Sequence, residues 1–149
     1  MATLTTTLTE NLNLNNSLRG STNTVTTENI NDVFERIVTC TASAVTTVAV
    51  FDTLPSTSAG AIDVDRTKYI RLTNLEAEVD IELAVVTTTT NYQVTLTAGQ
   101  SHILCAGQEV ALGEVDTTPS FGTMENITSL QVKPTTAVTA RVEVFVGVE

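Results

Sequence analysis

The feature that most constrains this fold is an alternation of apolar and polar residues in which the polar member is often threonine. The sequence contains 30 Thr among 149 residues. Threonine is β-branched, so its side chain has few rotamers and fits the pleated surface of a strand, while its hydroxyl group tolerates water. A chain that alternates Val, Ile and Leu with Thr can therefore place one face of each strand in a core and the other in solvent.

The alternation divides the later part of the chain into eight or nine short candidate strands. The clearest is the segment 79–85, whose buried positions are predicted to be Val79, Ile81, Leu83 and Val85. Asp80 and Glu82 lie between them and are predicted to be exposed. The other candidate strands are residues 33–40, 45–51, 68–74, 92–96, 101–105, 109–112, 130–132 and 140–148.

The spacing of these segments predicts the fold class. Turn-forming residues recur about every 8 to 12 residues, as in sandwiches and jelly rolls. No segment has the i, i+3, i+4, i+7 spacing of an amphipathic helix over three turns, and only residues 29–32 are expected to begin a short helical turn. With no crossover helices, the sheets should be antiparallel. We predict an all-β protein: a single antiparallel β-sandwich or jelly-roll-like domain over residues 31–149.

Residues 1–30 differ from the rest of the chain. They contain few apolar side chains and many Thr and Asn, so they cannot form a core of their own. Turn formers interrupt the alternation at residues 15–17 and again at residues 19–21. We predict an extended N-terminal arm with one or two strands that pair with another chain. A disordered terminus is the alternative.

The leucines of this arm are its candidate partner contacts. They are too apolar for a plain solvated tail, which suggests that another protein surface covers them. The candidate partner-binding residues are Leu4, Leu8, Leu12, Leu14 and, next to the turn at Gly20, Arg19.

Charge and hydropathy limit the partners of the chain. The formal net charge is −10, whereas binding to nucleic acid by phosphate neutralisation needs a basic patch. Lys68 and Lys133 are the only lysines, and the arginines are scattered. No run approaches the roughly 20 apolar residues of a membrane span, and the first residues lack the basic and apolar regions of a secretory signal. We expect neither nucleic acid nor a membrane as a partner, and no Sec export.

The residues that usually perform catalysis are scarce and unpatterned. His102 is the only histidine, and no nucleophile-elbow motif accompanies it, so it is expected to be a surface or half-buried strand residue. Cys40 and Cys105 are 65 positions apart, without the clustered spacing of a zinc site. Both are predicted to be buried, reduced thiols, with a disulfide as the alternative.

Two carboxylate pairs complete the search for chemistry. Asp63 and Asp65, like Asp80 and Glu82, place two acids on one side of a strand, without the glycine-containing loop of a calcium site. The absence of Trp from the sequence weakens the glycosidase and carbohydrate-binding alternatives. We therefore predict no catalytic, metal-binding or cofactor-binding residue, and a structural or interaction protein instead of an enzyme.

Several short segments of the chain form a further set of motifs: the opening MATLTTTLTE with RGSTNT, YIRLTNL at 69–75, LTAGQS at 96–101 and the ending VEVFVGVE. Together they resemble small structural proteins of tailed-phage virions, particularly marine and cyanobacterial ones. These motifs are structural and carry no catalytic or ligand residues. The resemblance implies a β-sandwich present in many copies on a virion, on the capsid exterior.

This resemblance gives the expected function and partners. A capsid decoration or cement protein would be attached to the head exterior by its N-terminal arm, would contact copies of itself and the major capsid protein or other virion proteins, and would need no cofactor. Assembly in a bacterial cytoplasm would keep both thiols reduced. The alternatives are a tail, neck or fibre component of the virion and, from another class, an adhesin or a glycan-binding module.

Overall fold

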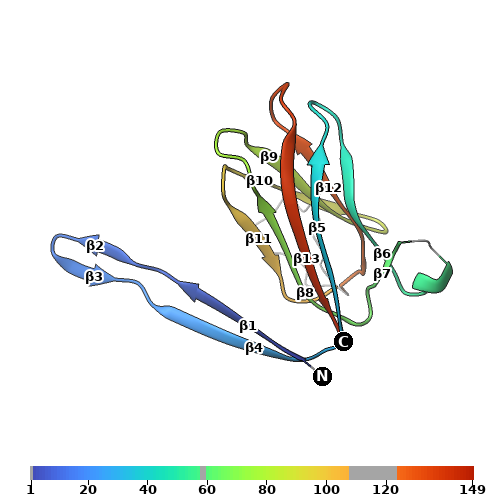
Figure 1. Ribbon diagram of the computed structural model, residues 1–149, viewed down its shortest axis with the longest axis horizontal. Coiled ribbons are helices and arrows are strands. Elements are labelled where there is room, and N and C mark those ends of the chain that lie inside the picture. Colours follow the sequence, from blue (N-terminus) through green and yellow to red (C-terminus); the bar gives the residue numbers. More distant parts are fainter. Residues whose placement is uncertain (1, 58–59, 108–123) are drawn as a thin grey trace, which may run out of the picture.

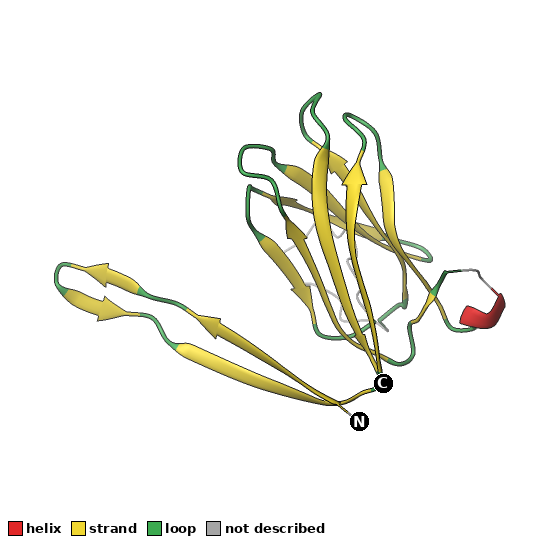
Figure 2. Cartoon of the chain, viewed as in Figure 1, coloured by secondary structure: helices red, strands yellow, loops and turns green. Residues whose placement is uncertain are grey.

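The computed structural model describes residues 2–57, 60–107 and 124–149. The described chain consists of strands joined by loops and one 3-10 turn at Pro55–Thr57, so the all-β prediction is confirmed (Figures 1 and 2). The strands of the main body are β5 (Asp32–Cys40), β6 (Thr46–Asp52), β7 (Ile62–Asp63), β8 (Thr67–Asn74), β9 (Ile81–Thr87), β10 (Asn91–Leu96), β11 (Ser101–Leu104), β12 (Ile127–Pro134) and β13 (Ala140–Val148).

The body is an antiparallel sandwich with the strand order of a jelly roll. One sheet has the order β11-β8-β13-β5 and the other β10-β9-β12-β6-β7, with the short β7 parallel to β6 at its edge. The antiparallel pairs are nested along the chain: β5 with β13, β6 with β12, β8 with β11, and β9 with β10. The first strand of this body therefore pairs with the last, and rolling the nested pairs together gives the two-sheet arrangement that defines a jelly roll.

The core lies between the two sheets and is made of aliphatic side chains. The largest fully buried ones are Ile70, Leu72, Ile81, Leu83, Ile127, Leu130, Val85, Val132, Val142, Val144 and Val146. The predicted register of residues 79–85 is confirmed at Ile81, Leu83 and Val85, which are buried, and at Glu82, which is exposed. Val79 and Asp80 are both half-buried because they precede the first residue of β9.

Asn74 is the one fully buried polar side chain among the largest buried residues. Its amide Nδ2 donates to the carbonyl oxygens of Val79 (2.7 Å), Leu96 (3.2 Å) and Thr97 (3.3 Å). Its Oδ1 accepts from the backbone N–H of Glu76 at 3.1 Å. One side chain therefore joins the end of β8 to the start of β9 and to the end of β10.

Residues 2–30 form a β-hairpin separate from both sheets. Its strands are β1 (Ala2–Thr9), β2 (Leu12–Leu14), β3 (Ser17–Arg19) and β4 (Thr22–Ile30), with β1 paired to β4 and β2 to β3. At the tip, Asn15 and Asn16 have φ of 51° and 57°. Two consecutive left-handed residues make the type I′ turn that suits a two-residue hairpin, and Asn tolerates this conformation. The strands thus pair with each other, whereas the sequence predicted pairing with another chain.

The hairpin is attached to the sandwich at its base and projects away from it (Figure 1). Ile30, the last residue of β4, is buried, with its Cδ1 atom 3.3 Å from where a Cβ would lie at Gly147. The next residue, Asn31, donates its backbone N–H to the carbonyl oxygen of Val148 at 2.8 Å. The close approach of Ile30 to a position without a side chain therefore fixes where the hairpin leaves the body.

Several predicted elements differ from the structure. The helical turn expected at residues 29–32 is wrong, because Asn29 belongs to β4, with a left-handed φ of 63°, and Ile30 and Asp32 also belong to strands. The strand predicted at 79–85 begins two residues later, at Ile81, and the strand predicted at 130–132 extends over Ile127–Pro134. The predicted strand 101–105 ends one residue earlier, at Leu104. The candidate strand 109–112 lies outside the described residues.

Candidate interaction surface

Strand alternation sorts the side chains of the hairpin into two rows. Leu8 lies opposite Asn23 and Leu12 lies opposite Arg19, so these pairs are four positions apart on each strand and the register is kept between the two ladders. One row, called the leucine row here, contains Leu4, Leu8, Leu12, Leu14, Arg19 and Val25, with polar side chains such as Thr6 and Asn23 among them. All five partner-binding candidates from the sequence therefore fall in one row.

The opposite row of the hairpin is made of threonines along β1 and β4. They form three cross-strand pairs between Thr5, Thr7, Thr9, Thr22, Thr24 and Thr26. Nearer the tip, the same face carries Asn13 opposite Leu18, which is 76% exposed. Hydroxyl groups pair across the ladder between Thr7 and Thr24 (3.3 Å) and between Thr9 and Thr22 (3.4 Å). Paired threonines stabilise a two-stranded ribbon and leave a polar surface along β1 and β4, so the two rows differ in chemistry over these strands.

The base of the leucine row lies over the sandwich. Leu4 and Thr6 are half-buried, and a groove of about 360 Å³ separates this part of the hairpin from Tyr69, Ile103 and Phe145 on the outer face of the β11-β8-β13-β5 sheet. The rings of Tyr69 and Phe145 meet edge to face, with centroids 6.0 Å apart. Leu4 is thus partly covered by its own chain, whereas the other four partner-binding candidates are exposed.

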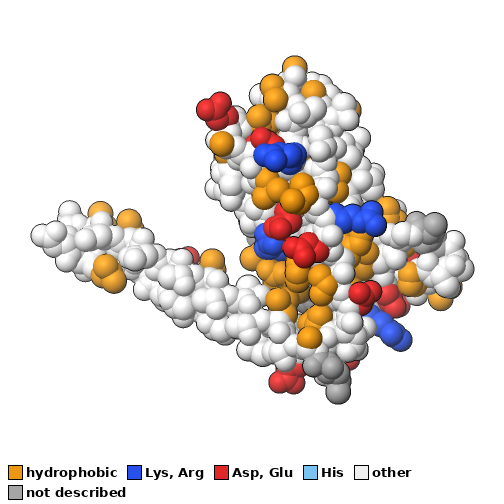
Figure 3. All heavy atoms as spheres, viewed as in Figure 1, with side chains coloured by type: hydrophobic (Ala, Val, Ile, Leu, Met, Phe, Trp, Pro, Cys, Tyr) orange, Lys and Arg blue, Asp and Glu red, His pale blue; other side chains and the backbone are white. Residues whose placement is uncertain are grey.

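Beyond its base the leucine row is exposed. Leu8, Leu12 and Leu14 have exposed fractions of 59%, 56% and 54%. Val25, in the same row, is 53% exposed, and Figure 3 shows hydrophobic side chains along the projecting hairpin. Sequence reasoning missed Val25, although the Asn15–Asn16 turn fixes the register that would have placed it. Large apolar side chains gathered on a projecting element are typical of a protein-binding surface.

The outer face of β5 carries a second exposed aliphatic pair. Val33 and Ile37 are 45% and 64% exposed, and exposed Glu35 lies between them on the same face. β5 is an edge strand of its sheet. Next to it on β13, Glu143 forms an ion pair of 2.6 Å with Arg71 of β8. This face therefore combines apolar side chains with a paired charge.

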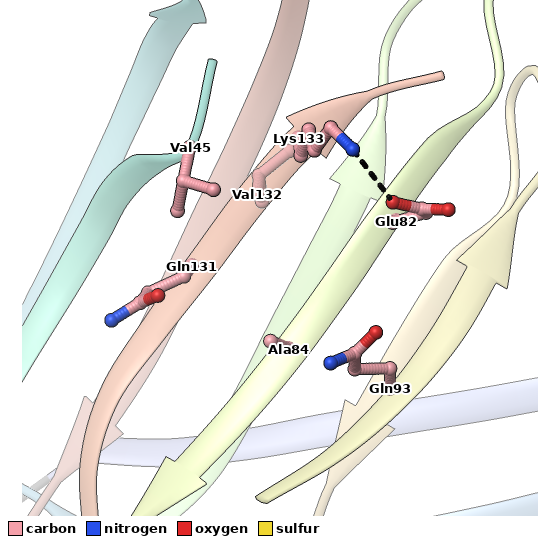
Figure 4. A pocket seen from close by; sticks show the side chains of 7 residues that line it. All are labelled: Val45, Glu82, Ala84, Gln93, Gln131, Val132 and Lys133. Carbon is pink, nitrogen blue, oxygen red and sulfur yellow. Dashed lines mark ion pairs between the residues drawn. The ribbon is translucent and has the colours of Figure 1, made fainter. Parts of the chain in front are cut away.

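The outer face of the other sheet is more polar. Figure 4 shows a shallow depression there, in which Glu82 of β9 and Lys133 of β12 form an ion pair at 3.8 Å. Gln93 and Gln131 project from the neighbouring strands. Charged and amide side chains at such separations are typical of a solvated sheet surface, so this face is a weaker candidate for a protein partner than the leucine row.

The described residues hold no group of three or more His, Cys, Asp and Glu that would suit a metal ion. His102 is half-buried in β11, and its Nε2 lies 3.0 Å from the hydroxyl of Tyr92 on β10. Asp63 closes a turn, because its Oδ1 accepts from the backbone N–H of Asp65 (3.1 Å) and of Arg66 (3.3 Å). Each group thus has a structural role in the fold.

The two cysteines are in different environments, and both thiols are free. Cys40 is fully buried at the end of β5. Burial raises the pKa of its thiol, and a hydrogen bond from Thr46 opposes the rise. Cys105 is exposed, so the prediction that both side chains are buried is wrong for Cys105. It follows buried Leu104, the last residue of β11, so alternation places it on the outer side of the sheet with exposed Ile103.

Glu125 links two segments that are distant in the sequence, and the sequence analysis does not predict this role. Its carboxylate accepts hydrogen bonds from the Thr87 hydroxyl (2.6 Å) and from the backbone N–H of Thr89 (3.1 Å). Hydrogen bonds lower the pKa of Glu125, and the one from the Thr87 hydroxyl has the largest effect. The carboxylate thereby fastens the turn between β9 and β10 to the segment before β12. Nothing in the local sequence pattern predicts this contact, because 36 residues or more separate the partners.

Comparison with protein-family models, curated proteins and solved structures finds no match for the chain. Among the described residues, no helix is long and apolar enough to cross a membrane.

Proposed function

We propose that this protein is a non-enzymatic structural protein of a tailed-phage virion, a capsid decoration or cement protein held on the head exterior through its N-terminal hairpin. In this role the leucine row is covered by neighbouring protein in the particle, and the sandwich faces outward. The protein acts in many copies, as a homo-oligomer in contact with other virion proteins, and is assembled in the host cytoplasm without a cofactor.

One observation carries the proposal: Leu8, Leu12 and Leu14 are exposed together in one row of a hairpin that projects from the body. A free protein gains nothing by exposing Leu8, Leu12 and Leu14 together, because each would stabilise a complex by about 1.5–3 kcal/mol if fully buried. The threonine hydroxyl pairs on the opposite row hold the ribbon in its extended shape. Binding therefore costs less conformational entropy than it would with a disordered tail.

The fold supports the same role by analogy. Jelly rolls occur in viral capsid proteins, but also in lectins and cupins, so the fold alone does not decide between a virion role and a glycan-binding role. The hairpin favours the virion role, because it offers a protein-binding row and no polar cleft for a sugar. The resemblance of the opening MATLTTTLTE to phage virion proteins points the same way.

The direct test is attachment of a truncated protein. Deleting residues 2–28 retains Ile30, which packs at Gly147, so the sandwich should fold. Binding would be measured by co-sedimentation with phage heads that lack the native protein. We expect the truncated protein to lose attachment. Full occupancy by the truncated protein would show that the hairpin does not hold it on the particle.

A matched pair of variants separates the row from the hairpin as a whole. Replacing Leu8, Leu12 and Leu14 with Ser removes the exposed leucines of the leucine row, whereas replacing Thr7, Thr22 and Thr24 with Ser changes the same number of side chains on the opposite row. We expect the leucine variant to bind heads weakly and the threonine variant to bind like the native protein. Equal losses in both would contradict a specific role for the leucine row.

A further inference from the structure

Two exposed aliphatic surfaces lie at opposite edges of one sheet. The sheet order is β11-β8-β13-β5. The hairpin extends past the β11 side of the body, and β2, which carries exposed Leu12 and Leu14, lies toward its far end (Figure 1). Val33 and Ile37 are exposed on β5, at the other edge. Each subunit therefore carries an overhanging apolar row on one side and an uncovered apolar strand on the other.

We propose that the leucine row of one copy packs on the outer face of β5 in a second copy, joining subunits head to tail. The inference rests on the proposed function and deepens it, because it names the neighbour that covers the row. The contact surface on the second copy is Val33, Glu35 and Ile37.

The base of the hairpin shows the geometry of such a contact. There Leu4 and Thr6 already face the outer side of their own sheet, across the groove floored by Tyr69 and Phe145. A second copy placed edge to edge would continue this surface, with its β5 next to the β11 of the first. The row from Leu8 to Leu14 spans about 20 Å, and the exposed residues from Val33 to Ile37 span about 13 Å, at 3.3 Å per residue. The contact surface on β5 therefore fits within the length of the row.

Charge complementarity favours a second copy of this chain as the occupant. Arg19 is the only basic residue in residues 1–30 and lies in the leucine row opposite Leu12. Glu35 lies between the two exposed aliphatic residues of β5. Among the ion pairs of the described residues, none includes Arg19 or Glu35. A head-to-tail contact pairs these two oppositely charged side chains.

The contact is heterologous, since it joins two different surfaces of the same chain. Such contacts close into rings when the rotation between copies allows it, and otherwise continue as open chains. On a particle with repeated binding sites, either form would link neighbouring copies laterally. The proposed cement role then gains a physical basis, because each copy holds the next.

Cysteine cross-linking tests the contact. In a Cys105→Ser background, the double variant Leu12→Cys/Ile37→Cys should form a ladder of disulfide-linked multimers on non-reducing gels, in concentrated solution and on decorated heads. The control pairs Leu12→Cys with Val138→Cys, since Val138 is also exposed, at 54%, but lies outside the contact. Only low background cross-linking is expected from the control.

Charge exchange tests the pairing of Arg19 with Glu35. In the cross-linking background, Arg19→Glu and Glu35→Arg should each lower the ladder yield severalfold, and the two together should restore it. Failure of the double exchange to restore the yield, or a ladder equally strong in the Val138→Cys control, would overturn the proposal. These positions are exposed, so neither change should prevent folding.

The outcomes separate this inference from the proposed function. If Leu12→Cys on heads cross-links to a shell protein and not to Ile37→Cys, the head-to-tail contact is wrong while attachment through the hairpin stands. If the ladder forms in solution but the protein binds no heads, the contact stands and the virion role is wrong.

Discussion

Replacing Asn74 with Ala should destabilise the sandwich more than its small change in volume suggests. Asn74 is fully buried at the end of β8, and its amide group donates to three carbonyl oxygens, of Val79, Leu96 and Thr97. Its Oδ1 accepts from the backbone of Glu76. The alanine variant would remove every one of these bonds and leave their backbone partners inside the protein.

The magnitude follows from the number of groups left unpaired. A typical hydrogen bond contributes about 1 kcal/mol net, and a buried group left without a partner costs about 1–3 kcal/mol. The bond to Val79 is the shortest, at 2.7 Å, and the two longer ones share the remaining donor. At about 1 kcal/mol each, the short bond, the two longer bonds counted as one, and the accepted bond give a loss of about 3 kcal/mol in the free energy of unfolding. That is a large part of the roughly 5–15 kcal/mol by which a domain is stable.

The assay is urea unfolding of Asn74→Ala, with Asn23→Ala in the exposed part of the hairpin as the matched control. We expect the midpoint to fall for Asn74→Ala with an unchanged m-value, and to stay nearly constant for the control. Asn74→Asp should lose still more at neutral pH, because a carboxylate would face carbonyl oxygens without a donor. A fall of less than about 1 kcal/mol in the unfolding free energy of Asn74→Ala would refute the view that this side chain holds the ends of β8, β9 and β10 together.

Three further predictions address the register, the acid range and the thiols. Ile81→Asp should prevent soluble folding, because it buries an unpaired carboxylate, whereas Glu82→Gln should change the unfolding free energy by at most about 0.5 kcal/mol; the reverse ranking would show that the register of β9 is wrong. Arg141 donates to the Glu76 carboxylate from its Nε at 3.0 Å and from its backbone N–H at 2.9 Å, and lowers the pKa of Glu76. A carboxyl group whose pKa is lower in the folded state stabilises the fold at pH values above its ordinary pKa. This stabilisation is lost as the pH falls through the folded-state pKa. Glu76→Gln should therefore flatten the acid side of the plot of unfolding free energy against pH, and an unchanged plot would contradict the pairing. Cys105 should react with a thiol reagent in the folded protein while Cys40, buried and with a raised pKa, reacts only on unfolding; equal rates in mass spectrometry would contradict the different burial of the two.

The strands of the body were largely predictable because their pattern is local. In β9, each apolar residue that the alternation assigned to the core from Ile81 onward is buried, since a half-buried strand needs a period of two. The sandwich class follows from the spacing of such segments. The nested pairing of β5 with β13 does not, because no local pattern encodes which strands meet across a hundred residues of chain.

The hairpin shows where local reasoning stopped short. The sequence predicts a turn at residues 15–17, and the two left-handed residues Asn15 and Asn16 make it a tight two-residue turn. That turn sets the register, and the register places Leu12 and Arg19 opposite each other and Val25 in the same row. Had the turn type been read from the sequence, self-pairing and the complete leucine row could both have been predicted.

Contacts between distant residues account for most of what could not be predicted. Glu125 meets Thr87 and Thr89 across 38 and 36 positions. Asn74 looks like an ordinary turn residue in the sequence, and only the packing of β10 beside β9 brings the Leu96 and Thr97 carbonyls to its amide. Such polar contacts depend on the tertiary fold, and residue spacing gives no indication of them.

We propose that this chain is a structural protein of the phage head. The decisive measurement is quantitative mass spectrometry of purified virions, with the copy number of this protein compared with that of the major capsid protein. We expect a copy number of the same order as that of the major capsid protein. Absence from the virion, or only the few copies of a tail or neck ring, would contradict it.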